Sequence, residues 1–182
     1  GPHPDTESKQ FKKVNGGIKW ADEDEVRYRV DIPEGDIRDA VLAAVATLDL
    51  AIGSVTFVND DINPDTNPCS GVANTIDFSA VPVDGDGGML ASAAACFNTK
   101  TKVISGFRMR FDAGDLWSTD ETEGTFDVQN VATHEMGHVV GLAHVNAAKD
   151  GCLTMYKFSD RGETQKRTLG WGDLRGLDRL YD

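Results

Sequence analysis

The sequence predicts one α/β domain with a mostly parallel sheet, because strand-like and helix-like segments alternate along its 182 residues. Apolar and charged side chains alternate over residues 26–30, a pattern that is typical of a half-buried strand. Apolar residues then recur at helical spacing from Ile37 to Ile52. Asp36 is the expected N-cap of this helix, and Gly53 supplies its stop.

Further strands are predicted from short apolar runs, over residues 55–58, 75–81 and 103–111. The segment 89–97 is dominated by alanine and fits either a strand or a short helix. Clusters of Asn, Asp, Pro and Gly predict the intervening loops or turns, which cover residues 59–74, 84–88 and 114–124.

Two more helices are predicted in the C-terminal part of the chain. Asp127 is the expected N-cap of the first helix, which should stop at Gly141. Asp173 is the expected N-cap of the second helix, whose apolar residues share one face. Residues 147–170 lie between the two helices and show little regular pattern.

The first 17 residues are predicted to be a tag remnant and a flexible N-terminus, because they are polar. Gly1-Pro2 resembles the remnant that a tag-removal protease leaves behind. The domain itself is therefore expected to cover residues 18–182.

Charge and hydropathy argue against two kinds of partner. The net charge of -12 disfavours nucleic acid, since phosphate binding needs a basic surface. No apolar run reaches the roughly 18 residues that a membrane span requires. We therefore expect a monomer without a nucleic-acid partner or a membrane span, and an acidic cleft would favour basic substrates.

Three of the four histidines follow the pattern HExxHxxGxxH. His134 and His138 are four residues apart, so on a helix both imidazoles can face one metal ion. Gly141 allows a sharp turn that returns His144 as a third ligand, which predicts one catalytic Zn²⁺ with a fourth position for water. Glu135 is placed to reach that water without binding the metal. The alternative is a helix whose histidines are ordinary surface or core residues.

This motif resembles the signature of the metzincin zinc peptidases, and among them it is most similar to the matrixins. Met155, in the segment Leu153-Thr154-Met155-Tyr156, resembles the methionine turn of that family. Residues 84–93, 111–117 and 172–181 are also similar to matrixin segments. The resemblance implies a twisted, mostly parallel five-stranded sheet with an antiparallel rim strand, two long helices and a C-terminal helix.

The resemblance also implies a function: a secreted, extracellular zinc endopeptidase that hydrolyses extended polypeptides, with Glu135 as general base on zinc-activated water. The substrate would add to the rim strand through main-chain hydrogen bonds, at positions that correspond to Gly88, Leu90 and Ala91. Tyr156 would help to wall the pocket for the residue after the scissile bond.

Supporting roles follow from the same resemblance. Met155 would lie beneath the zinc, and Asp173 would hydrogen-bond to the methionine turn as well as cap its helix. A possible Ca²⁺ site of the family has carboxylate counterparts here, although they could equally be solvated turn residues. These counterparts are Asp84, Asp112 and Asp115.

The sequence departs from the matrixin pattern in two respects. The positions that would hold a second, structural zinc contain no histidine, so that zinc is predicted to be absent; they are Asp77, Ser79, Ser92 and Arg110. Val145 replaces a common serine, and Lys157 replaces the usual proline after Met-Tyr, which leaves substrate preference open.

The cysteines number three, which fits one disulfide with a free thiol or three thiols. Their spacing does not suggest a cysteine zinc site. In a secreted protein, Cys69 and Cys96 could close a moderate loop, leaving Cys152 free, and we favour this pairing over reduced thiols.

Two other functions remain open on the same scaffold. One is a catalytically silent module that binds a partner through its cleft, although such a module has no need of Glu135. The other is a zinc hydrolase that acts on a non-peptide bond.

Overall fold

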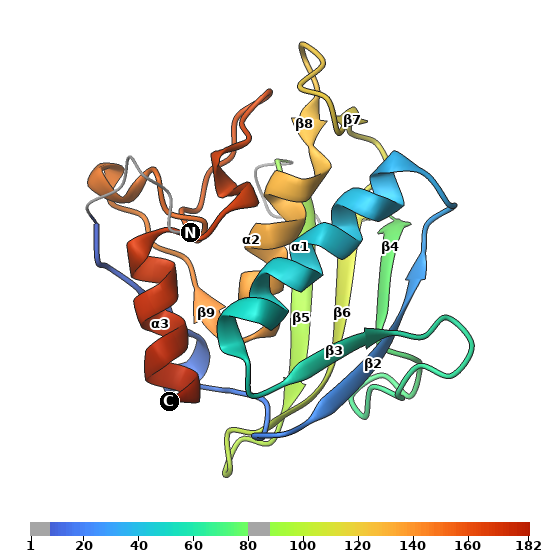
Figure 1. Cartoon of the computed structure of the whole chain (residues 1–182), viewed down its shortest axis with the longest axis vertical. Coiled ribbons are helices and arrows are strands. Elements are labelled where there is room, and N and C mark those ends of the chain that lie inside the picture. Colours follow the sequence, from blue (N-terminus) through green and yellow to red (C-terminus); the bar gives the residue numbers. More distant parts are fainter. Residues whose placement is uncertain (1–7, 80–87) are drawn as a thin grey trace.

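The computed structural model describes residues 8–79 and 88–182, and its centre is a five-stranded sheet with the strand order β3-β2-β4-β6-β5 (Figure 1). The strands are β2 (Glu25–Asp31), β3 (Thr56–Asn59), β4 (Thr75–Ser79), β5 (Ala91–Phe97) and β6 (Ile104–Asp112). Four of them run parallel, and β5 at the edge is antiparallel to β6. This arrangement confirms the predicted mostly parallel sheet with an antiparallel rim strand.

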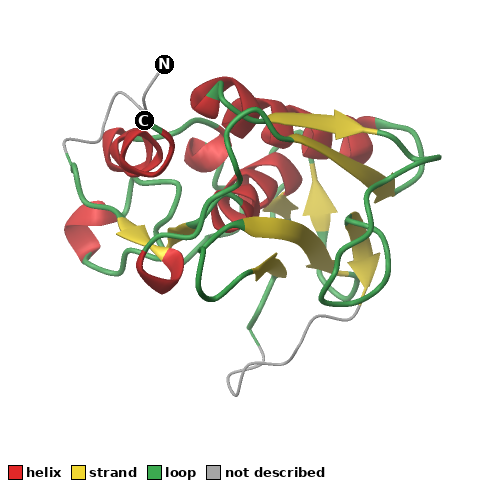
Figure 2. Ribbon diagram, turned by 90° about the horizontal axis from the view of Figure 1, so that it is seen from below, coloured by secondary structure: helices red, strands yellow, loops and turns green. Residues whose placement is uncertain are grey.

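Three helices complete the domain: α1 (Asp36–Ile52), α2 (Val128–Val139) and α3 (Trp171–Tyr181). Helices α1 and α2 lie side by side over the sheet (Figure 1). The buried stripe of α1 consists of Val41, Ala44, Val45 and Leu48, and it joins one continuous apolar core with the sheet. Helix α3 stands apart from the sheet and is seen nearly end-on, beside the C-terminus, from below (Figure 2).

The alanine-rich segment forms a strand and not a helix. Residues 91–97 pair with β6 along almost their whole length, so long-range pairing outweighs the helix preference of alanine. The predicted loop at 114–124 contains a two-residue strand, β7 (Trp117–Ser118), which pairs with β8 (Phe126–Asp127). Most of the predicted turn at 84–88 lies outside the described residues.

One of the three predicted N-caps is in place, and two are wrong. The carboxylate of Asp127 accepts a hydrogen bond from the backbone N–H of Asn130 at 2.8 Å and so caps α2. Asp36 is instead the first residue of α1, because Gly35 makes the entry turn with φ 141°. Asp173 is the third residue of α3 and not its N-cap, yet its carboxylate still caps the helix by accepting the N–H of the N-cap residue Gly170 at 2.9 Å.

Residues 8–17, which precede the predicted domain boundary at residue 18, contact the domain through backbone pairing. Strand β1 (Lys12–Lys13) pairs antiparallel with β9 (Leu142–Ala143), and the N–H of Val14 donates to the carbonyl of Gly141 at 2.8 Å. These polar residues are held through backbone hydrogen bonds, which do not depend on the side chain.

A disulfide joins Cys69 in the loop after β3 to Cys96 on the rim strand. It closes a loop with a sequence separation of 27 residues, and it confirms the favoured pairing. Cys152 is a free, half-buried thiol. The bridge ties the long loop after β3 to the strand that lines the site described below.

We expect the double substitution Cys69→Ser and Cys96→Ser to destabilise the fold by about 3 kcal/mol, because the unfolded chain regains the entropy of a loop of this length. For a domain of this size, the midpoint of thermal unfolding should fall by roughly 10 °C. Cys152→Ser is the matched control and should leave the midpoint nearly unchanged. Equal midpoints for the double variant and the control would contradict a stabilising bridge.

Candidate metal centre

The backbone of α2 and the turn after it place the three histidines of the motif. His134 and His138 lie on α2, which ends at Val139. Gly141 has φ 100°, and a Cβ atom at this position would lie 2.1 Å from the carbonyl oxygen of Ile18. Only glycine fits this turn, and the turn directs β9 and then His144 back toward the helix.

The three imidazoles converge on one point. The Nε2 atoms of His134 and His138 each lie 3.0 Å from Nε2 of His144. The other ring nitrogens are engaged: Nδ1 of His134 is 2.7 Å from the carbonyl oxygen of Thr154. Likewise, Nδ1 of His138 is 2.8 Å from the carbonyl oxygen of Leu142. A carbonyl only accepts, so each Nδ1 carries the hydrogen and each Nε2 presents a lone pair to the centre.

This donor set fits a zinc ion. Nitrogen ligands on one tetrahedral zinc, at about 2.0–2.1 Å, are roughly 3.3 Å apart, close to the separations found here. The carbonyls that hold Nδ1 are the outer partners that fix ligand histidines in metal sites. Within the described residues, this triad is the one group of three or more metal-binding side chains that is close enough to share an ion.

Burial keeps the three histidines in the neutral form that binds metals. Burial lowers the pKa of His134 well below the usual value of a histidine, and the charge of the neighbouring His138 is the second largest cause. The pKa of His138 is lowered by burial too. Burial also lowers the pKa of His144 to about 4. A deprotonated triad accepts a cation without first losing a proton.

Glu135 is buried next to this triad and lines the same cavity. Burial raises the pKa of its carboxyl to about 8, while a hydrogen bond from the backbone N–H of Ala93 acts in the opposite direction. Ala93 belongs to the rim strand β5. The carboxyl group is therefore held between the histidine helix and the edge of the sheet.

Met155 and Asp173 form a support beneath α2. A Cβ atom on Gly137 would lie 2.3 Å from the sulfur of Met155, so the methionine packs directly against the helix backbone between the two ligands. The carboxylate of Asp173 accepts hydrogen bonds from the N–H groups of Thr154 at 2.8 Å and Met155 at 3.1 Å. The contact implied by the resemblance is thus present, and it fixes the peptide whose carbonyl holds His134.

A cavity of about 470 Å³ opens over the triad. The predicted substrate-binding residues Gly88, Leu90 and Ala91 line it along the rim strand. Tyr156 is not among the described residues that line this cavity, so its role in the pocket wall stays a prediction. Its ring packs against Phe158, at 5.7 Å between centroids. The wall after the methionine turn consists of Lys157, Phe158 and Ser159.

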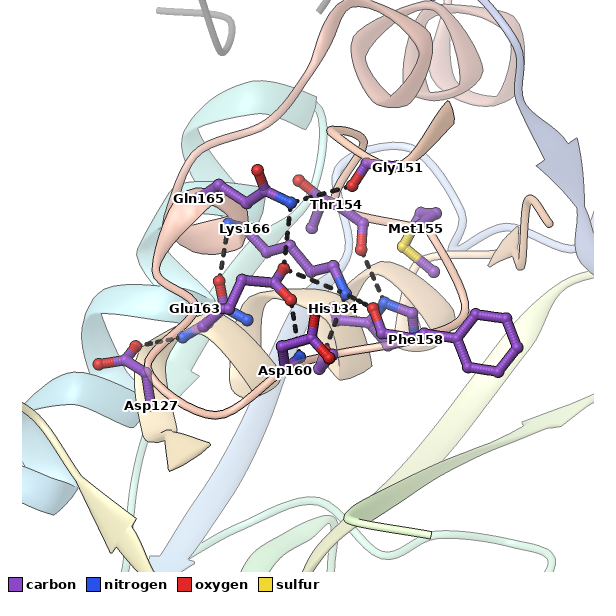
Figure 3. A network of polar contacts seen from close by, with 12 residues as sticks. Asp127, His134, Gly151, Thr154, Met155, Phe158, Asp160, Glu163, Gln165 and Lys166 are labelled. Atoms are coloured by element: carbon purple, nitrogen blue, oxygen red, sulfur yellow. Dashed lines mark hydrogen bonds and ion pairs between the residues drawn. The ribbon is translucent and has the colours of Figure 1, made fainter. Parts of the chain in front are cut away.

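This wall is anchored by Lys166, a lysine whose side chain is 0% exposed (Figure 3). Its Nζ donates to the carbonyl of Phe158 and, at 2.8 Å, to Oγ of Ser159. The Glu163 carboxylate lies 3.4 Å away and opposes the lowering of the Lys166 pKa by burial. The backbone N–H of Lys166 donates to Asn130 on α2 at 2.7 Å. One residue therefore joins the wall to the helix that carries the histidines.

The candidate calcium ligands are only partly described. Asp84 lies outside the described residues. Asp112 accepts a hydrogen bond from the N–H of Gly114 at 2.8 Å, as a turn aspartate does. Burial, and next the charge of Asp112, raises the pKa of Asp115. Calcium binding stays a prediction.

The positions that correspond to a second zinc site lie on neighbouring strands. Asp77 forms an ion pair with Arg108 at 2.8 Å and accepts a hydrogen bond from Ser79. Ser92 on β5 is paired with Arg110 on β6. The absence of a structural zinc remains a prediction from the missing histidines.

Known proteins resemble this chain in sequence. A family model described as Matrixin matches residues 19–182. Stromelysin-3 from Homo sapiens is 38% identical over 101 residues, which cover 56% of this chain and 18% of that protein. Metalloendoproteinase 1 from Glycine max is 36% identical over 106 residues, which cover 55% of this chain and 31% of that protein. Matrilysin from Homo sapiens is 32% identical over 111 residues, covering 61% of this chain and 38% of that protein.

The fold is also found in a solved structure. The structure of myroilysin superimposes with a TM-score of 0.55 at 13% identity, and the match covers 92% of this chain and 84% of that chain. Fold and histidine centre together define a metzincin-type catalytic domain. The chain belongs to the matrixin family, because the family model matches it over almost its whole length.

Proposed function

We propose that this protein is a zinc-dependent endopeptidase that hydrolyses peptide bonds in extended polypeptides. The observation that carries the proposal is the convergence of the Nε2 atoms of His134, His138 and His144 beside the buried carboxyl of Glu135. Two findings support it: the chain belongs to the matrixin family, and one similar protein is named Metalloendoproteinase 1. The segment matched by each curated relative is a minor part of that relative, so the activity of this chain is inferred from its own site.

The chemistry is divided between the ion and the carboxyl group. A zinc ion held by the triad would polarise the scissile carbonyl and lower the pKa of water. Glu135 takes a proton from the attacking water as the new C–O bond forms, and passes it to the leaving amine nitrogen as the C–N bond breaks. Its buried position favours holding that proton near neutral pH.

Substrate binding is assigned to the rim of the sheet. Strand β5 is the last strand in the sheet order, so an extended peptide can pair along its outer edge. Residues of this strand line the cavity over the triad together with Glu135. A peptide on this edge would run past the histidines with its backbone extended, which is the geometry that an endopeptidase needs.

The test is cleavage of casein before and after removal of zinc. We expect treatment with 1,10-phenanthroline to abolish cleavage, and added Zn²⁺ to restore it at about one ion per chain, because the triad supplies one site with three ligands. Elemental analysis of the zinc-loaded protein checks the ratio. A ratio near two would contradict the predicted absence of a structural zinc.

Two outcomes would oppose the proposal. Cleavage that survives complete zinc removal would exclude a zinc mechanism. Absence of cleavage by protein that contains zinc, tested on several unfolded proteins, would favour the silent binding module. Addition of Mg²⁺ in place of Zn²⁺ is the matched control, because imidazole ligands do not suit it.

We further propose that the protein acts outside the cell. The Cys69–Cys96 disulfide supports this location, because such bridges persist in oxidising compartments. In the described part of the chain, no helix has the length and apolar character needed to cross a bilayer. We infer a monomer that acts on polypeptides, with calcium binding still to be tested by thermal unfolding with and without Ca²⁺.

A further inference from the structure

The charge of the cavity lining differs from the charge of the whole chain. The chain carries a net charge of -12, yet the ionic side chains among the described lining residues, histidines aside, are Glu135 and Lys157. Glu135 is buried and accepts a hydrogen bond from the backbone of Ala93. Lys157 is exposed, so the accessible charge in the cavity is a cation.

The backbone around Lys157 is fixed on both sides. Its own N–H donates to the carbonyl of Val145 at 3.1 Å, one residue after the ligand His144. The following carbonyl, of Phe158, is held by the buried ammonium of Lys166. The Lys157 ammonium lies 5.5 Å from the centre of the Phe158 ring, so side chain and ring form one surface of the wall.

No carboxylate of the described residues neutralises this lysine. Lys157 forms no ion pair within residues 8–79 and 88–182, and Glu163, which follows later in the same segment of the chain, is engaged elsewhere. One oxygen of Glu163 faces Lys166 at 3.4 Å, and the other accepts the N–H of Asp160 at 2.9 Å. The positive charge of Lys157 is also felt at the metal centre. Burial and the charge of His138 are the larger causes of the lowered pKa of His144, and the charge of Lys157 is the next.

We propose that Lys157 is a specificity-determining residue that selects peptides with an aspartate or glutamate side chain next to the scissile bond. A peptide in the cavity contacts the rim strand and the wall at once, so a side chain that points toward the wall meets the ammonium. This inference rests on the proposed peptidase function. It reverses the expectation, drawn from net charge alone, that the cleft would favour basic substrates.

The experiment starts from the bonds that the zinc-loaded protein cleaves in casein, mapped by mass spectrometry. Quenched fluorescent peptides around one such bond are made in matched pairs, with Glu or Gln at each flanking position in turn. At the position that faces Lys157, we expect kcat/KM for the Glu peptide to exceed that for the Gln peptide about threefold to fivefold, as for an exposed ion pair. The preference should weaken with added NaCl.

Substitutions at Lys157 then decide whether this residue is the cause. Lys157→Gln should bring the Glu/Gln ratio close to one, and Lys157→Glu should invert it and favour a Lys peptide. Lys149→Gln removes an exposed lysine outside the cavity lining and should keep the ratio of the unchanged protein. A ratio near one at all positions in the unchanged protein, or a ratio that survives Lys157→Gln, would overturn the proposal.

A binding measurement separates this inference from the proposed function. Fluorescence anisotropy gives the affinity of the Glu and Gln peptides for the zinc-loaded Glu135→Gln protein, with and without Lys157→Gln. If casein is not cleaved, the endopeptidase proposal fails, and the anisotropy is then measured with extended casein-derived peptides that carry Glu or Gln at each position in turn, so that it still decides on Lys157. Equal affinities for the two peptides would refute acidic selection whether or not cleavage occurs.

Discussion

Glu135→Gln is expected to lower kcat/KM for peptide hydrolysis by at least about 10²–10⁴, because the amide cannot take the proton of the attacking water. Glutamine has nearly the same shape and can still accept the hydrogen bond from the N–H of Ala93. The triad is untouched, so zinc content should stay at about one ion per chain. Steady-state kinetics on a casein-derived peptide and elemental analysis of the same sample check both expectations.

Glu34→Gln is the control for this substitution, since Glu34 is exposed and lies outside the cavity lining. Turnover by Glu135→Gln equal to that of the control would refute the role of Glu135 as proton carrier. If Glu135→Gln loses both its zinc and its turnover, the carboxyl group has a structural role in metal retention instead. The two readouts therefore distinguish chemistry from metal retention.

Asp173→Ala is expected to destabilise the fold by about 3–6 kcal/mol, because it leaves three buried N–H groups without their acceptor. These groups belong to Thr154 at 2.8 Å, Met155 at 3.1 Å and Gly170 at 2.9 Å. For a domain of this size, the thermal midpoint should fall by more than about 10 °C. Calorimetry on the zinc-free protein measures the effect without a contribution from metal binding.

Asp178→Ala is the matched control, because Asp178 lies on the same helix and is exposed. It should shift the midpoint by only a few degrees, since surface substitutions usually change stability within about 0.5 kcal/mol. Similar shifts for both variants would contradict the expected cost of leaving three buried N–H groups without an acceptor. In that case the buried hydrogen bonds would contribute little net stability.

The features that sequence reasoning found are those with a local periodic pattern or a fixed spacing. The helix over residues 36–52 follows from its apolar stripe and from Gly53, which ends it in a left-handed conformation. The zinc ligands follow from a four-residue spacing and a glycine turn, both of which are properties of the nearby backbone. The family resemblance added the number of strands and the antiparallel rim strand, which no local pattern contains.

The features that sequence reasoning missed depend on contacts between distant segments. Lys166 has no motif around it, and lysine is rarely buried, so nothing in the sequence indicated its anchoring role. The part of the cavity wall formed by Lys157, Phe158 and Ser159 was not predicted, because no motif marks these residues. Asp173 was expected to be an N-cap, yet Gly170 is the N-cap of α3, and its N–H donates to the Asp173 carboxylate at 2.9 Å.

The anchoring of the cavity wall has a consequence for how the substrate preference of the proposed peptidase can change. The histidines and Glu135 lie on α2 and the short segment after it, whereas residues 157–159 belong to an irregular segment that the buried Lys166 ammonium and a backbone hydrogen bond to Val145 hold in place. Substitutions in that segment can alter the choice of substrate while the reacting groups keep their geometry. Substrate preference can thus change, in evolution or by design, through residues 157–159 while the metal ligands and Glu135 stay the same.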